Sequence, residues 1–158
     1  MPHRAVVAVT TAGTLALISA PAVAQAPASL VFREVQKGST FGFVDNPPRS
    51  KNPRRPRPSA GDDLVFTIPL AKGGRARGTL RATCTITSIV KRRTSALCYG
   101  VLALKEGELV VVVSSSNLDD PTTTGSIVGG TRAYAGAHGT FVSATTKDGT
   151  IDTVTFTD

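Results

Sequence analysis

Hydrophobic and polar residues alternate over a long stretch in the middle of the chain. Between residues 79 and 87 every second residue is apolar, and the residues between them are threonines and an arginine. Successive side chains of a β-strand point to opposite faces of a sheet, so this pattern predicts an antiparallel strand with one buried face. The residues on the predicted buried face are Leu80, Ala82, Cys84 and Ile86.

Further strands are predicted by apolar and β-branched runs that end at short polar or glycine-rich turns. The run Leu109–Val113 is apolar throughout, which is typical of a strand covered on both faces. No segment after residue 26 has the spacing of an amphipathic helix. The other predicted strands lie at 30–36, 40–44, 62–70, 96–105, 140–146 and 151–157. We therefore expect an all-β fold, an eight-stranded antiparallel up-and-down β-barrel closed by its last strand.

A glycine-rich stretch near the end of the chain organises this prediction. Four glycines lie between Ile127 and Phe141, among small residues and one tyrosine. Glycine tolerates backbone conformations that strain other residues, so such a stretch favours a tight bend between strands. We predict a strand that enters at Ile127, a sharp corner over 129–139 and a strand that leaves from Thr140, with a polar loop at 117–125 before them.

The first 26 residues have the three parts of a secretory signal peptide. Arg4 supplies a positive charge, residues 5–20 are apolar, and small residues follow that allow cleavage after Ala24 or Ala26. An uncleaved anchor or a buried helix is the alternative. The prediction is a secreted, extracellular protein with a signal peptide at 1–26 and one barrel domain at 27–158.

Two cysteines flank a predicted hairpin turn. Cys84 and Cys98 are the only cysteines, and they are nearly equidistant from Lys91, where the chain reverses. Residues at such positions face each other across an antiparallel pair, within reach of a disulfide. We expect a Cys84–Cys98 disulfide, in keeping with an exported protein.

The segment Asp45–Ala60 contains five prolines and five basic residues and contributes much of the chain's net charge of +7. Its prolines exclude regular helix or sheet pairing, and we expect the loop to be little ordered. One interpretation is a solvated insertion. Another is a lid beside the barrel mouth, or an arm that docks on an anionic envelope polymer. Nucleic acid is not expected as a partner, because the chain lacks tryptophan and the loop lacks aromatic residues that could stack on bases.

Few residues offer chemistry. Glu34 shares a strand face with Leu30 and Phe32, so it either projects into the barrel lumen or pairs with a surface base. His138 is the only histidine after residue 26 and could form an acid–base pair with Glu34; otherwise it is a residue of the corner. No metal site and no cofactor are indicated. The aromatic candidates for contact with a ligand are Phe32, Phe41, Tyr99 and Tyr134.

Several of these segments together resemble one family. The sequence Ile127-Val128-Gly129-Gly130-Thr131, followed by Ala137-His138-Gly139, resembles the late corner of dirigent proteins and allene oxide cyclase-like barrels. Residues 32–34 and 41–47 resemble the first two dirigent strands, and residues 78–84 resemble the cyclase strand that carries a lumenal cysteine. The resemblance implies an eight-stranded barrel, an acid that serves the reaction at Glu34, and a homotrimer.

The family's functional residues are only partly matched. Ala133 stands where dirigent proteins have an acid, and His138 stands where they have an arginine. In the best ungapped register, Val31 and Arg33 occupy the positions of the cyclases' acid and asparagine. Since fold alone does not determine function, three hypotheses follow: a barrel that binds or positions a small hydrophobic molecule, an isomerase or cyclase that uses Glu34 and His138, and a non-catalytic protein that interacts with the envelope.

Overall fold

The computed structural model describes residues 28–52 and 57–157, and it is built from strands. The predicted signal peptide and part of the proline-rich loop lie outside the described residues. In the described part no helix is long and apolar enough to cross a membrane. A 3₁₀ helix, η1, spans Arg132–Tyr134. The strands are β1 (Ser29–Glu34), β2 (Thr40–Val44), β3 (Asp63–Lys72), β4 (Arg75–Val90), β5 (Arg93–Leu104), β6 (Gly107–Ser115), β7 (Thr122–Gly130), β8 (His138–Thr146) and β9 (Gly149–Thr157).

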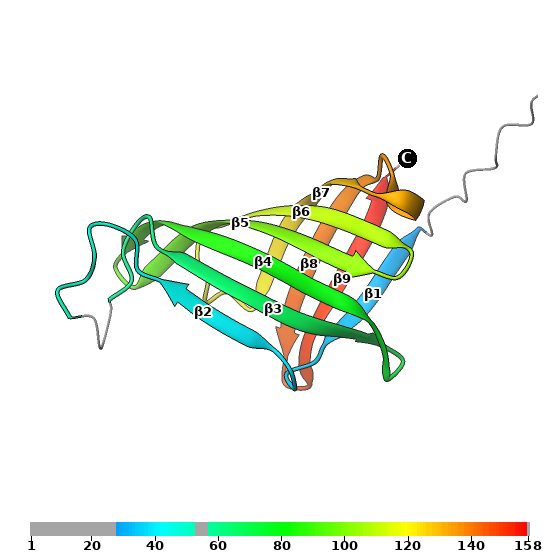
Figure 1. Ribbon diagram of the computed structural model, residues 1–158, viewed down its shortest axis with the longest axis horizontal. Helices are drawn as coiled ribbons and strands as arrows, with labels where there is room; N and C mark the ends of the chain where they lie inside the picture. The colour runs from blue at the N-terminus through cyan, green and yellow to red at the C-terminus, as the bar shows by residue number, and fades with distance from the viewer. Residues whose placement is uncertain (1–27, 53–56, 158) are drawn as a thin grey trace, which may run out of the picture.

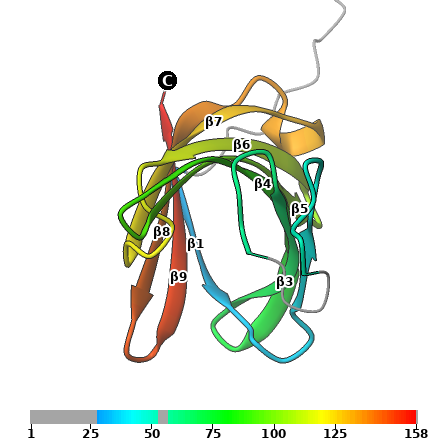
Figure 2. The same ribbon diagram turned by 90° about the vertical axis from the view of Figure 1, so that its left-hand side faces the viewer.

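The strands form one antiparallel sheet that closes on itself. Their order is β1-β9-β8-β7-β6-β5-β4-β3-β2, and β1 also pairs with β3. From β3 to β9 each strand is hydrogen-bonded to the next strand in the sequence, as in an up-and-down barrel (Figure 1). Figure 2 shows the ring from one end, with β9 and β1 on one side and β3 and β4 on the other. The predicted closed eight-stranded barrel is confirmed.

The eighth position of the ring is shared by two short strands. β1 pairs with β9 over five residues but with β3 only through Arg33 and Glu34, which face Ala71 and Leu70. The chain then turns, and β2 pairs with the other half of β3, with Thr40 facing Thr67 and Val44 facing Asp63. Glu34 therefore lies where the chain leaves β1 and the pairing on β3 passes to β2.

On each strand, every second side chain points into the lumen. The core contains residues from β1 and from every strand between β3 and β9, and the pattern 80, 82, 84, 86 on β4 faces inward as predicted. Leu109, Val111 and Val113 of β6 are buried, whereas Val110 and Val112 on the other face are only partly buried. The prediction that this run is covered on both faces is thus wrong for the outer face.

The glycine-rich corner closes one end of the barrel. The chain passes from β7 through η1 into β8, and Tyr134 of η1 is buried with its ring 6.0 Å from that of Phe156. A Cβ atom on Gly130 would lie 2.5 Å from the Tyr134 carbonyl oxygen, so only glycine fits beneath η1 at this point. β7 begins at Thr122, so the predicted loop at 117–125 is wrong in its second half. Thr122–Thr124 pair with β8, and Gly125 pairs with both β6 and β8.

The base of the proline-rich loop is held by a buried carboxylate. Asp62 accepts hydrogen bonds from the Asn46 N–H (2.9 Å), the Ser59 N–H (2.7 Å) and the Ser59 hydroxyl (3.0 Å). Burial alone would raise the pKa of Asp62, but the hydrogen bonds from Ser59 and Asn46 outweigh it and lower the pKa. The two ends of the loop are therefore fastened together at the barrel rim, an anchoring that the proline and arginine content does not predict.

Candidate functional site

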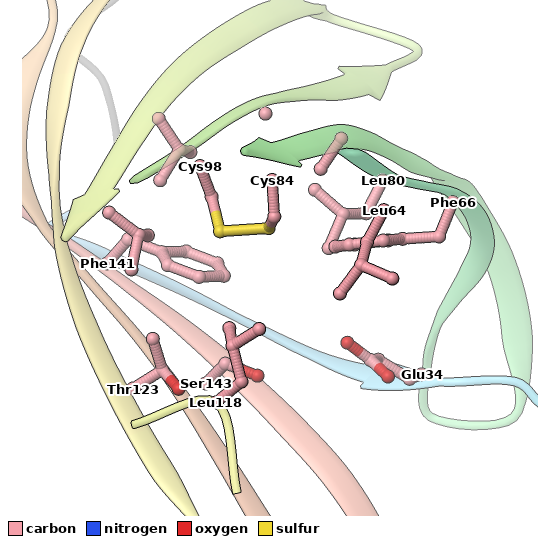
Figure 3. Close-up of a pocket in the computed structure, with 14 residues that line it drawn as sticks. Glu34, Leu64, Phe66, Leu80, Cys84, Cys98, Leu118, Thr123, Phe141 and Ser143 are labelled. Atoms are coloured by element: carbon pink, nitrogen blue, oxygen red, sulfur yellow. A yellow bond between two sulfur atoms is a disulfide. The ribbon is translucent and has the colours of Figure 1, made fainter. Parts of the chain in front are cut away.

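The Cys84–Cys98 hairpin forms one wall of the lumen. The two cysteines are direct partners on β4 and β5, their Cα atoms are 3.9 Å apart, and they form a disulfide. The predicted disulfide is confirmed. Disulfides are typical of oxidising compartments. Both sulfur atoms lie against the interior of the barrel (Figure 3), so the disulfide cannot supply a free thiol to the site.

A cavity of about 260 Å³ lies beside this disulfide in the lumen. Most of its wall is aliphatic or aromatic, and Leu118, from the loop between β6 and β7, contributes to it. The backbone N–H of Leu118 donates to the Thr94 carbonyl oxygen at 2.8 Å, which fastens that loop to β5. The complete lining is Glu34, Leu64, Phe66, Leu80, Ala82, Cys84, Cys98, Gly100, Val111, Val113, Leu118, Thr123, Phe141 and Ser143.

Glu34 is the one ionisable side chain in that lining. Figure 3 shows its carboxyl group projecting from the end of β1 into the cavity, opposite the disulfide. Burial raises the pKa of Glu34 from its ordinary value of 4.5 to about 7, and the negative charge of Asp152 adds to the rise. At neutral pH this group is therefore divided between a carboxylic acid that donates a proton and a carboxylate that accepts one.

Asp152 is a second acid of the lumen, and the sequence reasoning missed it. It faces Phe32 across the β1–β9 pair and Ser143 across the β8–β9 pair, and it is 0% exposed. Neither carboxyl oxygen has a hydrogen-bond partner among the described residues. Burial raises the pKa of Asp152 to about 6, although the nearby Ser143 hydroxyl partly opposes the rise. Asp152 lies two and four residues before Val154 and Phe156, so all three share one face of the strand. This spacing is the sequence signal that places Asp152 on the lumenal face.

Comparison with known proteins finds a solved structure with a similar fold. No protein-family model matches the sequence, and no curated protein does. The structure is similar to pyocyanin demethylase. The TM-score is 0.64 at 19% sequence identity, and the match covers 82% of this chain and 99% of the other. At this identity the likeness shows a shared barrel fold, and the resemblance to dirigent proteins and allene oxide cyclases stays a resemblance.

His138 is not brought near Glu34. It is exposed at the start of β8, opposite Thr157, whereas Arg33 lies opposite Ile151 on the same β9 strand. Six residues of β9 separate these two levels, which is roughly 20 Å at about 3.3 Å per residue. The side chain of His138 also points to the outer face of the sheet. Its neighbour Gly139 pairs with the inward-facing Phe156, and successive residues of a strand face opposite sides. The predicted Glu34–His138 pair in the lumen is therefore wrong, and Asp152 is the ionisable neighbour of Glu34.

The four aromatic candidates occupy three different environments. Phe32 is buried in the lumen core and Tyr134 under the corner, but neither lines the cavity. Phe41 is 71% exposed on β2, with its ring 5.8 Å from that of the cavity residue Phe66. Tyr99 is 58% exposed on the outer face, because it lies between the inward-facing residues Cys98 and Gly100. Tyr99 therefore points away from the lumen and does not line the cavity, and Phe66 and Phe141 are the aromatic residues of the cavity wall.

Proposed function

We propose that this barrel binds a small, largely apolar molecule in its lumen. The observation that carries the proposal is the cavity of about 260 Å³, whose lining of fourteen residues contains one ionisable side chain, Glu34. Small-molecule sites are typically concave and apolar, with a few polar groups that fix the orientation of the ligand. Glu34 is such a group.

The size of the cavity restricts the ligand. Pockets that hold drug-sized molecules measure roughly 300–1,000 Å³. At about 260 Å³ the lumen suits a compact molecule of one or two rings. The structural neighbour is named as a protein that demethylates pyocyanin, so a barrel of this architecture acts on a small molecule in that case. This supports the proposal at the level of architecture.

A second candidate function is that of an isomerase or cyclase. It is favoured by the pKa of Glu34, raised to about 7, because a general acid–base works best when its pKa is near the working pH. In this reading Glu34 would remove a proton from the bound molecule and return it to another atom. His138 takes no part, since it lies at the other end of the barrel.

We test the proposed function by filling the lumen. Ala82 lies in the cavity wall and its neighbour Thr83 lies on the outer face of the same strand. Binding of the uncharged probe 2-(1-naphthyl)ethanol is followed by its fluorescence, which is free of tryptophan background in this chain. We expect Ala82→Leu to weaken binding at least tenfold, about 1.4 kcal/mol, because the new side chain occupies the ligand's volume.

Thr83→Leu is the matched control, since it adds a leucine to the same strand on the outside. It should bind the probe as the wild type does. Thermal melts show whether each variant is folded. If Ala82→Leu is folded and binds as tightly as the wild type, the probe lies outside the lumen and the proposal fails.

A further inference from the structure

The two acids of the lumen have no cationic side chain to face them. On β1 itself, Arg33 projects to the outer face and its guanidinium donates to the Asp148 carbonyl oxygen. β3 places Leu70 opposite Glu34, and β8 places Ser143 opposite Asp152. The remaining elements that line the cavity contribute only uncharged side chains. Every described lysine and arginine is exposed, and none of them lines the cavity.

This imbalance is unusual for buried acids, which are normally paired with a cation or fully hydrogen-bonded. Asp152 is fully buried with the Ser143 hydroxyl near its carboxyl group but no cationic partner, and Glu34 is half-buried beside an apolar cavity. Glu34 and Asp152 share the inward face of β1 and β9 as diagonal neighbours, because Phe32 is the direct partner of Asp152. No side chain compensates a negative charge at this place, so each acid is neutralised either by a proton or by a cationic ligand.

We propose that the lumen selects apolar amines, with the ammonium group of the ligand at Glu34 and its ring system against Phe66, Phe141 and the disulfide. This proposal rests on the proposed function and names the ligand class. Asp152 adds a second negative charge near Glu34 but does not touch the ligand, because it does not line the cavity.

The shape of the site suits such a ligand. Glu34 lies on one side of the cavity, and the disulfide and Phe141 lie across from it (Figure 3). An organic cation needs one carboxylate and an apolar surface, both of which the lumen offers. A metal ion would need more: in the described part of the chain, no three side chains of the ligating types come together. The arrangement therefore favours an organic cation over a metal ion.

Binding of an ammonium group should be coupled to proton release. Both acids hold protons at higher pH than usual, because burial penalises their negative forms. A bound cation favours the carboxylate forms, so the protons leave to the solvent as the ligand enters. Affinity for an amine then rises with pH, roughly tenfold per pH unit for each proton released.

The experiment compares two probes of nearly the same shape, 2-(1-naphthyl)ethylamine and 2-(1-naphthyl)ethanol. Titration calorimetry on the full barrel is run from pH 5 to pH 8, in two buffers that differ in protonation enthalpy, so that released protons are counted directly. We expect the amine to bind at least tenfold more tightly than the alcohol at pH 8. We also expect the amine's affinity to fall steeply from pH 8 towards pH 5, whereas the alcohol's affinity should not fall. Binding of the amine should release protons, and binding of the alcohol should release none.

Two outcomes overturn the inference, and they are distinguishable from failure of the proposed function. If the alcohol binds in the lumen and the amine binds no more tightly at pH 8, the barrel binds apolar molecules but does not select cations. If the amine binds more tightly without pH dependence or proton release, its charge does not meet these acids. If neither probe binds, the proposed function fails together with the inference.

Charge-removing variants locate the effect. Glu34→Gln should abolish the preference for the amine, and Asp152→Asn should reduce the proton release and flatten the pH dependence while part of the preference remains. Asp148→Asn is the matched control, because this acid is exposed in the β8–β9 turn and its removal should change neither quantity. A preference that survives Glu34→Gln contradicts the proposal. The two-probe comparison on the wild type decides the question even if a variant does not fold.

Discussion

Removal of the Cys84–Cys98 disulfide, by Cys84→Ala with Cys98→Ala, is expected to lower the free energy of unfolding by about 3 kcal/mol. The bridge closes a loop with a sequence separation of 14, and a cross-link of this length restricts the unfolded chain by about that amount. The cysteines are also buried in the lumen wall, so their truncation to alanine removes packing contacts.

Urea unfolding of the wild type and the double variant measures this loss as a lower midpoint of the transition. The wild type treated with a reductant should move towards the double variant, which separates the effect of the bridge from that of the missing sulfur atoms. An unchanged midpoint in both experiments would show that the disulfide does not stabilise the barrel.

Glu34→Gln is expected to stabilise the barrel above neutral pH and to have little effect at pH 4. Below pH 4.5, its ordinary pKa, Glu34 is protonated in both the folded and the unfolded chain. Between pH 4.5 and about pH 7 the unfolded chain releases the proton while the folded barrel retains it, so wild-type stability falls as pH rises through this window. Asp152 acts in the same direction up to about pH 6.

The gain in stability depends on how far the pKa of Glu34 is raised and on how much solvent reaches the carboxyl group. The rise of the pKa from 4.5 to about 7 corresponds to about 3 kcal/mol of stability for a fully buried group. Because Glu34 is partly exposed, we expect about 1–2 kcal/mol. Urea titrations at pH 4, 6 and 8 should show the stability of Glu34→Gln and wild type diverging in that order. Asp148→Asn, which removes an exposed acid at the same end of the barrel, should show no such divergence. A constant difference at all three pH values would mean that Glu34 faces water.

The fold could be predicted because local patterns determine most of it. Alternation between residues 79 and 87 follows the two-residue period of a strand, and the turn at Lys91 places Cys84 opposite Cys98. The same period could have placed Tyr99 outside, because Cys98 and Gly100 on either side of it face the lumen.

The site was harder to predict because it depends on which strands meet. Glu34 was found through its strand face, but the position of His138 depends on how far β8 and β9 extend past β1, which no local pattern shows. The burial of Asp152, which raises its pKa, depends on its position between Phe32 and Ser143 on the neighbouring strands. Likewise, Asp62 anchors the proline-rich loop through Asn46 and Ser59, and the contact with Asn46 spans 16 residues.

The central claim is that the lumen is the binding site, and NMR with methyl-labelled leucine and valine tests it most directly. With 2-(1-naphthyl)ethanol bound, we expect nuclear Overhauser contacts from the naphthyl protons to the methyl groups of the cavity wall, those of Leu64, Leu80, Val111, Val113 and Leu118. The exposed Val65 and Val128 on the outer surface serve as internal controls and should show none. Contacts confined to the outer valines, with the lumenal methyl groups unperturbed, would contradict the account.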